Sequence, residues 1–256
     1  MTPWPFRPQT PPIAIAHRGG NEGGAENTIE AFAAAVAAGY RYVETDVHLT
    51  ADGEVVAFHD ADLARLAGRD GRIAAMNWRE LAGLRIRGGG RIPRLAEILT
   101  AWPELFLNID PKSDAVVQPL IALLRHHDAV ERVCVGSFSS ARLRTLRHAF
   151  GSALATSMGP VEILRLRLAS LGLAPAPVGA VCAQVPMRQY GLPVVDARFV
   201  ACAHRLGLKV HVWTINDRPC MEHLLDLGVD GIMTDDLSLL KTVFRERGLW
   251  PAADRG

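Results

Sequence analysis

The chain has 256 residues, with 28 basic and 27 acidic side chains and a formal net charge of +1 at pH 7. Apolar residues make up 49% and charged residues 21%, which is typical of a folded globular protein and excludes a disordered chain. Because the positive and negative charges nearly cancel, the chain has no excess of positive charge that could bind nucleic acid or an anionic membrane. The composition therefore favours a small-molecule ligand.

The cysteines and the N-terminal residues bear on the cellular compartment. The chain has four cysteines, with no CxxC pair among them: Cys134, Cys182, Cys202 and Cys220. This scatter predicts reduced thiols in a cytoplasmic protein rather than a zinc site or a disulfide framework. Residues 1–12 are proline-rich without an apolar core, so no signal peptide is expected there. The uncharged run 168–187 contains three prolines, so a membrane-spanning helix is not expected either.

The first predicted elements are a strand and a helix. Residues 13–17 are a largely apolar run, which is typical of a strand buried on both faces. Residues 27–40 place apolar side chains at the spacing of one helix face. Asn27, with Glu30 three residues later, is the expected N-cap of this helix.

A hairpin and an irregular segment follow. Residues 41–47 are predicted to form the second strand, and residues 54–60 return from a turn at Asp52-Gly53 as the second arm of a hairpin. Residues 61–91 are rich in turn-forming residues and contain one short helical piece. This segment is therefore predicted to be an insertion.

From residue 94 onward, strands and helices alternate regularly. The further strands are expected at 105–110, 133–138, 153–158, 179–185, 208–214 and 230–235. The further helices are expected at 94–102, 114–128, 139–149, 160–171, 196–206, 217–227 and from about 236.

Eight strands, each followed by a helix, predict parallel pairing with right-handed crossovers. In about 250 residues, this number of units corresponds to a closed (β/α)8 TIM barrel. The expected fold is an α/β TIM barrel as a single domain over residues 1–256, with the small insertion 61–91 after the second strand. A doubly wound open sheet is the alternative, but the run HRGGNEGG after the first strand lacks the GxGxxG spacing that this fold requires.

Polar residues cluster at the C-terminal ends of the predicted strands, where a TIM barrel carries its active site. They are His17, Arg18, Glu44, Asp46, His59, Asp60, Asn108, Asp110, Lys112, Trp213, Asn216 and Asp235. His17 alone would fit a core histidine equally well, but with His59 at the same rim the two imidazoles suit the acid and base halves of one reaction. His48 is expected at the surface, and His211 in the barrel wall.

Glu44 and Asp46 are two acids inside one strand. Side chains at positions i and i+2 of a strand share a face, with Cα atoms about 6–7 Å apart. Two buried acids so close repel each other unless a cation compensates them. An all-oxygen set without cysteine favours Mg²⁺ or Ca²⁺, and Asp110 on a neighbouring strand can supply a third carboxylate. Salt bridges to arginines at the barrel mouth are the alternative.

Several motifs together resemble one family. They are AHRGGNEGGAENTIEAFAAAVAAGYRYVETDVHLTADGEVVAFHD, RIPRLAEIL, LFLNIDPK, HVWTIN and GVDGIMTDD, in this order from about Ile13 to Leu240. The chain thereby resembles the bacterial glycerophosphodiester phosphodiesterases. The series HRG, ENT, ExD, DG, HD, WTxN and TD is much more specific than any of its parts.

The resemblance implies an activity and a catalytic centre. The activity is metal-dependent hydrolysis of glycerophosphodiesters, such as glycerophosphocholine or glycerophosphoethanolamine, to glycerol 3-phosphate and an alcohol, a reaction of lipid and glycerol metabolism. His17 and His59 would be the catalytic pair. One divalent cation, Mg²⁺ or Ca²⁺, would be held by Glu44, Asp46 and Asp110. The family usually has Glu where this chain has Asp110, so the third ligand is one methylene shorter here.

The resemblance also implies a substrate site. Arg18 and Lys112 would contact the phosphate, and Phe138 and Trp213 would form the apolar side of the pocket. Four further polar residues are candidates for orienting a histidine or the substrate: Glu26, Asn27, Asn216 and Asp235. Glu26, Asn27 and Asp235 fit a helix cap or a turn equally well.

Two other functions compete with this interpretation. A lysophospholipase D-like enzyme acting on lysolipids would carry an exposed apolar lip, formed by residues 61–91 or by the loop VPMRQYGL at 185–192. A non-catalytic barrel could bind a metal ion or phosphate, but it would have no need of two histidines.

Overall fold

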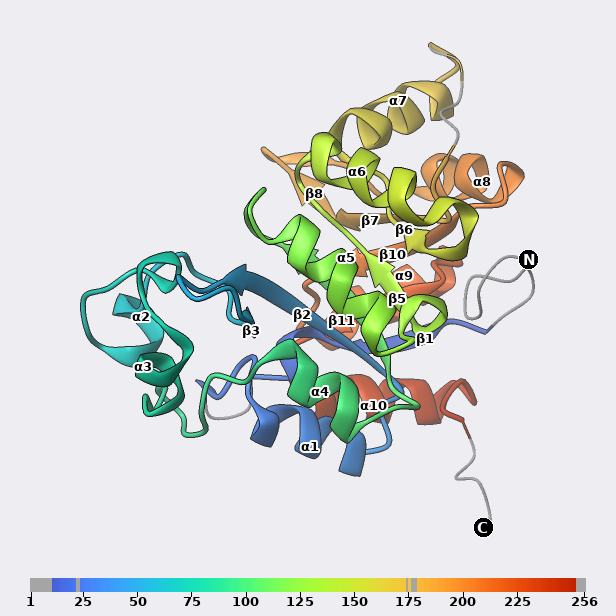
Figure 1. Cartoon of the computed structure of the whole chain (residues 1–256). Helices are drawn as coiled ribbons and strands as arrows, with labels where there is room; N and C mark the ends of the chain where they lie inside the picture. The colour runs from blue at the N-terminus through green and yellow to red at the C-terminus, as the bar shows by residue number, and fades with distance from the viewer. Residues whose placement is uncertain (1–10, 22–23, 174, 176–178, 252–256) are drawn as a thin grey trace.

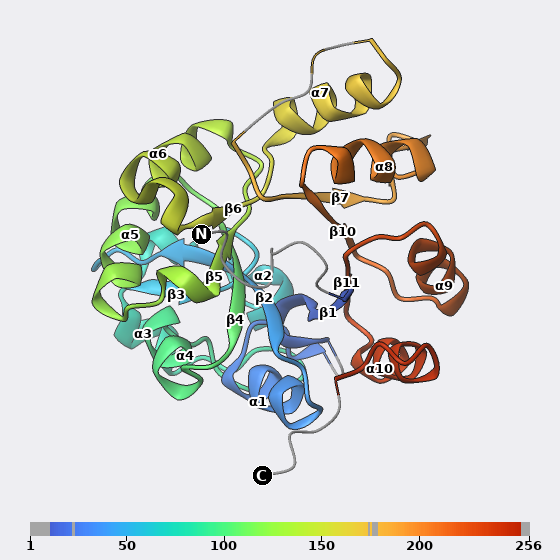
Figure 2. The same ribbon diagram turned by 90° about the vertical axis from the view of Figure 1, so that its right-hand side faces the viewer.

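The computed structural model describes residues 11–21, 24–173, 175 and 179–251 (Figure 1). Within these residues, eight parallel strands form one sheet that curls into a barrel, and helices cover its outside (Figure 2). The predicted TIM barrel is confirmed.

The strands follow one another around the barrel in the order β6-β5-β4-β2-β1-β11-β10-β7. Their bounds are β1 (Ile13–Ala16), β2 (Tyr42–Leu49), β4 (Phe106–Pro111), β5 (Val133–Val135), β6 (Ala155–Thr156), β7 (Cys182–Pro186), β10 (Lys209–Trp213) and β11 (Gly231–Thr234). The helices that follow them along the chain are α1 (Ile29–Ala37), α4 (Leu95–Ala101), α5 (Val117–His126), α6 (Ser140–Phe150), α7 (Pro160–Ser170), α8 (Ala197–Arg205), α9 (Arg218–Asp226) and α10 (Leu237–Glu246).

The two ends of this order, β6 and β7, meet through a few backbone contacts. Ser157 forms a parallel bridge with Cys182. The Met158 amide donates to the Cys182 carbonyl at 2.8 Å, and the Val181 amide donates to the Thr156 carbonyl at 3.1 Å. The barrel is therefore nearly closed, and the C-terminal ends of its strands lie at one rim.

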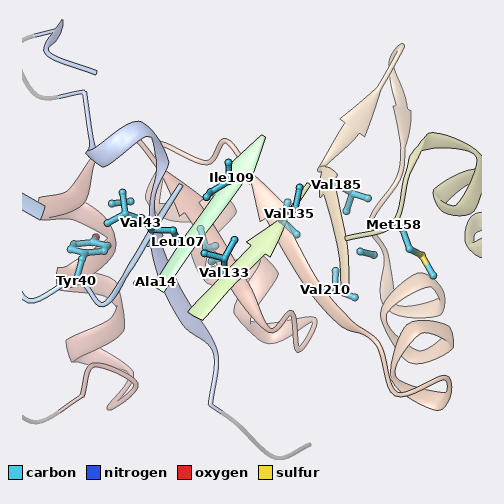
Figure 3. Close-up of a cluster of buried hydrophobic side chains, with 14 of the residues drawn as sticks. Ala14, Tyr40, Val43, Leu107, Ile109, Val133, Val135, Met158, Val185 and Val210 are labelled. Atoms are coloured by element: carbon cyan, nitrogen blue, oxygen red, sulfur yellow. The ribbon is translucent and has the colours of Figure 1, made fainter. Parts of the chain in front are cut away.

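Alternate side chains of each strand face opposite sides of the barrel wall. One set packs outward on the helices and builds the main core, to which Val43, Leu107 and Val135 belong (Figure 3). Phe32 of α1 and Phe244 of α10 lie in the same core and are at most 1% exposed. The strands are thus buried on both faces, which is why their sequences are nearly continuous apolar runs.

The prediction that Asn27 caps α1 is wrong. The N-cap is Thr28, whose Oγ1 accepts a hydrogen bond from the Ala31 amide at 3.0 Å. Asn27 has a left-handed backbone, with φ of 56°, and its side chain is buried. Its side-chain amide donates to Asp46 Oδ2 at 3.1 Å. The position of Asn27 is therefore determined by a contact with the end of β2 and not by capping of the helix.

The hairpin after β2 is confirmed, because β3 (Val55–Ala57) pairs with β2 in antiparallel register. Beyond it, residues 61–91 contain three short helices, α2 (Ala64–Ala67), η3 (Ile73–Ala75) and α3 (Trp78–Ala82). They enclose a separate cluster of buried apolar side chains, made of Val56, Phe58, Leu63, Leu66, Ile73, Met76, Leu81, Ile86 and Ile92. This cluster lies to one side of the barrel, next to β2 and β3 (Figure 1).

A second small hairpin was not expected from the sequence. β8 (Arg188–Gln189) and β9 (Leu192–Pro193) pair in antiparallel register after β7. Their two-residue turn is Tyr190-Gly191, with φ of 49° and 78°. Positive φ at both turn positions is the geometry of a tight hairpin, but Tyr in place of Asn or Asp hides the usual sequence signal.

The described helices include none that is both long enough and apolar enough to cross a membrane. The uncharged run 168–187 instead contains the end of α7 and all of β7.

We expect Gly231→Ala to destabilise the barrel. A Cβ at Gly231 would lie 2.8 Å from Cδ2 of the His211 ring and 3.0 Å from Ile13 Cγ1, inside the barrel. Overpacking of this kind costs about 1–3 kcal/mol of the free energy of unfolding, which urea denaturation measures. Gly83→Ala is the control, because its Cβ would meet nothing within 4 Å and its φ is −82°. Equal stability of the two variants would contradict this account of the barrel interior.

Candidate active site

Parallel register brings the predicted polar residues to one rim. β2 pairs with β4 so that Asp46 lies opposite Asp110. β1 pairs with β11 up to Ala16 and Thr234, so His17 and Asp235 follow directly at the ends of neighbouring strands. Residues that are far apart in the chain thereby become neighbours.

His17 lies between two carboxylates. Its Nδ1 is hydrogen-bonded to Asp235 Oδ1 at 2.7 Å, and its Nε2 lies 3.8 Å from Glu44 Oε2. Burial lowers the pKa of His17, but Asp235 and Glu44 outweigh burial, so the pKa is raised above its ordinary value. Asn216 donates to Asp235 Oδ2 at 2.8 Å and accepts from the Asp235 amide at 2.8 Å. Asp235 and Asn216 therefore orient the His17 ring.

Glu44 and Asp46 are both buried on β2, with 6% and 2% of their surface exposed. Glu44 Oε2 accepts from the Arg18 amide at 3.1 Å. Burial and the negative charge of Asp46 raise the pKa of Glu44. Burial also acts to raise the pKa of Asp46, but the positive charges of Lys112 and Arg18 outweigh burial, so this pKa is lowered. Among the described residues, a side-chain ammonium, that of Lys112, is bound to Asp46 and none to Glu44.

Lys112 joins the two strands. Its Nζ lies 2.6 Å from Asp46 Oδ1 and 2.8 Å from Asp110 Oδ2. Burial acts to lower the pKa of Lys112, but the two carboxylates outweigh burial and the pKa is raised, so Lys112 stays protonated. The pKa of Asp110 is raised, with burial the largest cause. Lys112 thus compensates the charge of Asp46 and Asp110, and among the described residues no three acidic, histidine or cysteine side chains form a ready metal cluster.

Arg18 lies in a short 3₁₀ turn, η1 (His17–Gly19), with a left-handed φ of 55°. Its guanidinium donates to Glu26 Oε1 at 2.9 Å, and its Nε lies 3.2 Å from Asp46 Oδ2 in an ion pair without hydrogen-bond geometry. Glu26 is only 3% exposed. One salt bridge to an arginine, the alternative to a metal ion, is therefore present at Asp46.

His59 follows β3 and is about one-third exposed. Its Nδ1 is hydrogen-bonded to Asp60 Oδ1 at 2.6 Å. The surface position expected for His48 is wrong, since it is 7% exposed and its Nε2 is hydrogen-bonded to the His59 carbonyl at 3.1 Å. The hairpin pairing of His48 with Val56 turns its side chain inward and supports the chain at His59.

Phe138 and Trp213 form an apolar side of the rim. Their rings meet edge to face, with centroids 5.9 Å apart, after β5 and at the end of β10. Phe138 is 71% exposed, so its ring is open to a ligand. The interior below is polar in part: Gln184 donates to Asn108 at 2.8 Å, and burial lowers the pKa of His211 to about 4.

One residue of this site, Arg65 of α2, was not predicted from the sequence. It donates to both Glu26 and Asp60, at distances down to 2.6 Å. Arg65 is one of several arginines in an irregular segment, and no local pattern distinguishes it from them.

Comparisons with known proteins identify the family of this chain. The model of the glycerophosphoryl diester phosphodiesterase family matches residues 17–239. The chain belongs to this family. A Mycobacterium tuberculosis relative named "Probable glycerophosphodiester phosphodiesterase 2" is 35% identical over 253 residues, which cover 94% of each chain. A glycerophosphodiester phosphodiesterase of Caldanaerobacter subterraneus is 30% identical, covering 92% of this chain and 99% of the relative.

The fold comparison leads to the same family. A Silicibacter pomeroyi crystal structure with the family's name has a TM-score of 0.79 and 26% identity, covering 94% of this chain and 96% of that one. The protein is therefore an enzyme of the glycerophosphodiester phosphodiesterase type, a phosphoric diester hydrolase.

We expect Asp235→Asn to lower the pKa of His17. The Asp235 carboxylate stabilises the imidazolium, and without it burial and the charge of Arg18 remain as forces that lower the pKa. NMR titration of the His17 ring measures the shift. Asp226→Asn, an exposed substitution on α9, is the control. A His17 pKa that is the same in wild type and Asp235→Asn would contradict the assigned contact.

Proposed function

We propose that this enzyme hydrolyses small glycerophosphodiesters, such as glycerophosphocholine and glycerophosphoethanolamine, to glycerol 3-phosphate and an alcohol. The observation that carries the proposal is the matched setting of two histidines. His17 and His59 each have Nδ1 bonded to an aspartate, Asp235 and Asp60. In both rings Nε2 is therefore the nitrogen that can exchange a proton with a substrate.

The proton transfers follow from this setting. One histidine takes the proton of the attacking hydroxyl, and the other protonates the leaving alcohol. His17 Nε2 is 3.8 Å from Glu44, and the amide of Phe58, the residue before His59, donates to the Asp46 carbonyl at 3.0 Å, so both histidines lie beside the part of β2 that carries the acidic pair. Arg18 and Lys112 supply positive charge at this place, where the phosphoryl oxygens of a diester would gain charge in the transition state.

A divalent cation, Mg²⁺ or Ca²⁺, fits the donor chemistry of this rim. Glu44, Asp46 and Asp110 offer carboxylate oxygens only, which hard cations prefer. Burial is the largest cause of the raised pKa of Glu44 and of Asp110, so a cation bound beside them would stabilise both carboxylates in their ionised form. When bound, such an ion would withdraw charge from the phosphoryl oxygens of the substrate.

A lysophospholipase D-like activity is the second candidate, and one observation favours it. Large apolar side chains are exposed after β5 and on the hairpin of β8 and β9: Phe138, Tyr190 and Leu192, at 71%, 94% and 71%. An acyl chain could lie against such a lip. The buried charged rim suits any phosphodiester of glycerol, so the leaving group distinguishes the two activities.

The first test measures release of glycerol 3-phosphate from glycerophosphocholine. We expect activity in the wild type and a loss of kcat by about 10²- to 10⁴-fold in His17→Ala and in His59→Ala, because each removes one proton transfer. His223→Ala, exposed on α9, is the matched control and should behave as the wild type. Choline release from lysophosphatidylcholine without activity on glycerophosphocholine would support the second candidate. Binding of the diester without turnover would indicate a non-catalytic barrel.

The second test addresses the cation. We expect a chelator to abolish activity and either Mg²⁺ or Ca²⁺ to restore it. An ion that binds only the folded protein should also add about 2.7 kcal/mol to the free energy of unfolding at 100 times its Kd. Glu44→Gln and Asp110→Asn should reduce this stabilisation. Glu104→Gln, a substitution of an exposed glutamate that lies shortly before β4 in the chain, should not. Full activity in the chelator would contradict the metal proposal.

A further inference from the structure

The guanidinium of Arg65 lies between two carboxylates that belong to different parts of the rim. Toward Asp60 it donates from Nε to Oδ2 at 2.6 Å and from Nη2 to Oδ1 at 3.1 Å. Toward Glu26 it donates from Nη2 to Oε1 at 2.6 Å and from Nη1 to Oε2 at 3.2 Å. Both carboxylates are thus held by two hydrogen bonds each, the geometry in which an arginine fixes orientation most strongly.

The Asp60 contact reaches His59. Asp60 Oδ1 accepts from the His59 ring as well as from Arg65. Burial acts to raise the pKa of Asp60, but Arg65 and His59 outweigh it and bring the pKa to about 2, so this carboxylate stays ionised. Because the ring of His59 is about one-third exposed, packing alone does not fix it. The plane of the Asp60 carboxylate, held by Arg65, therefore sets the direction of the ring.

The Glu26 contact reaches Arg18. Glu26 Oε1 accepts from both Arg65 and Arg18, at 2.6 Å and 2.9 Å. Burial acts to raise the pKa of Glu26, but the two guanidinium groups lower it. Arg18 in turn borders Asp46 and follows His17 directly in the chain. A single side chain is thereby connected to both histidine-bearing loops.

The backbone of Arg65 is held in place by its neighbours in the chain. Arg65 lies on α2, and Leu63 and Leu66 on either side of it are buried in the apolar cluster of residues 56–92. The Leu66 carbonyl also accepts from the Arg87 amide at 2.6 Å. The short helix thus has a fixed position beside the barrel, next to β2 and β3 (Figure 1).

We propose that Arg65 is a positioning residue, through which the segment 61–91 holds His59, by way of Asp60, and Arg18, by way of Glu26, in a productive arrangement. This inference rests on the proposed function for its kinetic consequence. It gives the segment a role in assembling the catalytic rim, in addition to any role in choosing the leaving group.

The experiment compares kcat and KM for glycerophosphocholine in the wild type, Arg65→Ala and Arg65→Lys. We expect kcat to fall by about 10- to 100-fold in Arg65→Ala, because misplacement of a reacting group by about 1 Å has effects of this size, while KM changes by less than about threefold. Arg65→Lys retains the positive charge but not the paired hydrogen bonds of the planar guanidinium, and it should recover part of kcat. Arg69→Ala is the matched control, an exposed arginine of the same segment whose side chain, within the described residues, donates to the carbonyl of the next residue.

A double substitution shows through which residue Arg65 acts. If it acts on His59 through Asp60, adding Arg65→Ala to Asp60→Asn should lower kcat by much less than it does in the wild type. Full kcat in Arg65→Ala, or independent effects of the two substitutions, would overturn the proposal. Thermal unfolding of each variant distinguishes a folded enzyme from a damaged one. If Arg65→Ala does not fold, Arg65→Lys and Asp60→Asn still give the comparison.

A spectroscopic measurement is independent of turnover. NMR of the His59 ring nitrogens, assigned by their loss in His59→Gln, should show one tautomer with the proton on Nδ1 in the neutral wild-type ring. In Arg65→Ala the neutral His59 ring should become a mixture of its two tautomers. An unchanged signal would overturn the proposal. If the wild type hydrolyses no phosphodiester, the proposed function fails, while this measurement still decides whether Arg65 orients His59.

Discussion

The structure depends on the charge of two buried acids on one strand. Glu44 and Asp46 are two residues apart on β2, so they share a face, and both are nearly inaccessible to water. Buried like charges at this spacing are costly unless positive groups compensate them. The basic groups that lie around them, Lys112 and Arg18, bind Asp46, while Glu44 keeps a raised pKa. Basic side chains thus compensate the charge of Asp46, whereas Glu44 has the His17 imidazole as its neighbour, with Nε2 3.8 Å from Oε2.

The barrel brings those positive groups together without any local sequence relation. β2 has β1 on one side and β4 on the other, so the residues after those strands, His17-Arg18 and Lys112, flank the acidic pair. The hairpin of β2 and β3 returns the chain to the same rim and delivers His59. The carboxylates that hold the histidine rings come from two further places, Asp235 after β11 and Asp60 next to His59. One sheet thus brings both histidines and the charged side chains to a single edge.

Much of this could be predicted from the sequence, because the signals are local. Continuous apolar runs and helical periodicity determine the alternation of strands and helices, and eight such units leave few architectures besides a barrel. The i and i+2 spacing places Glu44 and Asp46 on one face whatever the surroundings are. Where the local signals were ambiguous or weak, the sequence was less informative. Asn27 fits an N-cap, but Thr28 caps the helix, and Tyr190-Gly191 lacks the usual signal of a hairpin turn, although the residues on either side of it pair.

The sequence by itself determined the fold class and the polar residues at the strand ends, since both follow from periodicity and from residue type. Only the tertiary structure decided which of these residues bind one another. Asn27 turns to Asp46, His48 turns to the backbone of His59, and Arg65 reaches Glu26 across 39 positions of the chain. Such contacts depend on strand register and on the packing of a separate apolar cluster, which act over distances that no local pattern encodes.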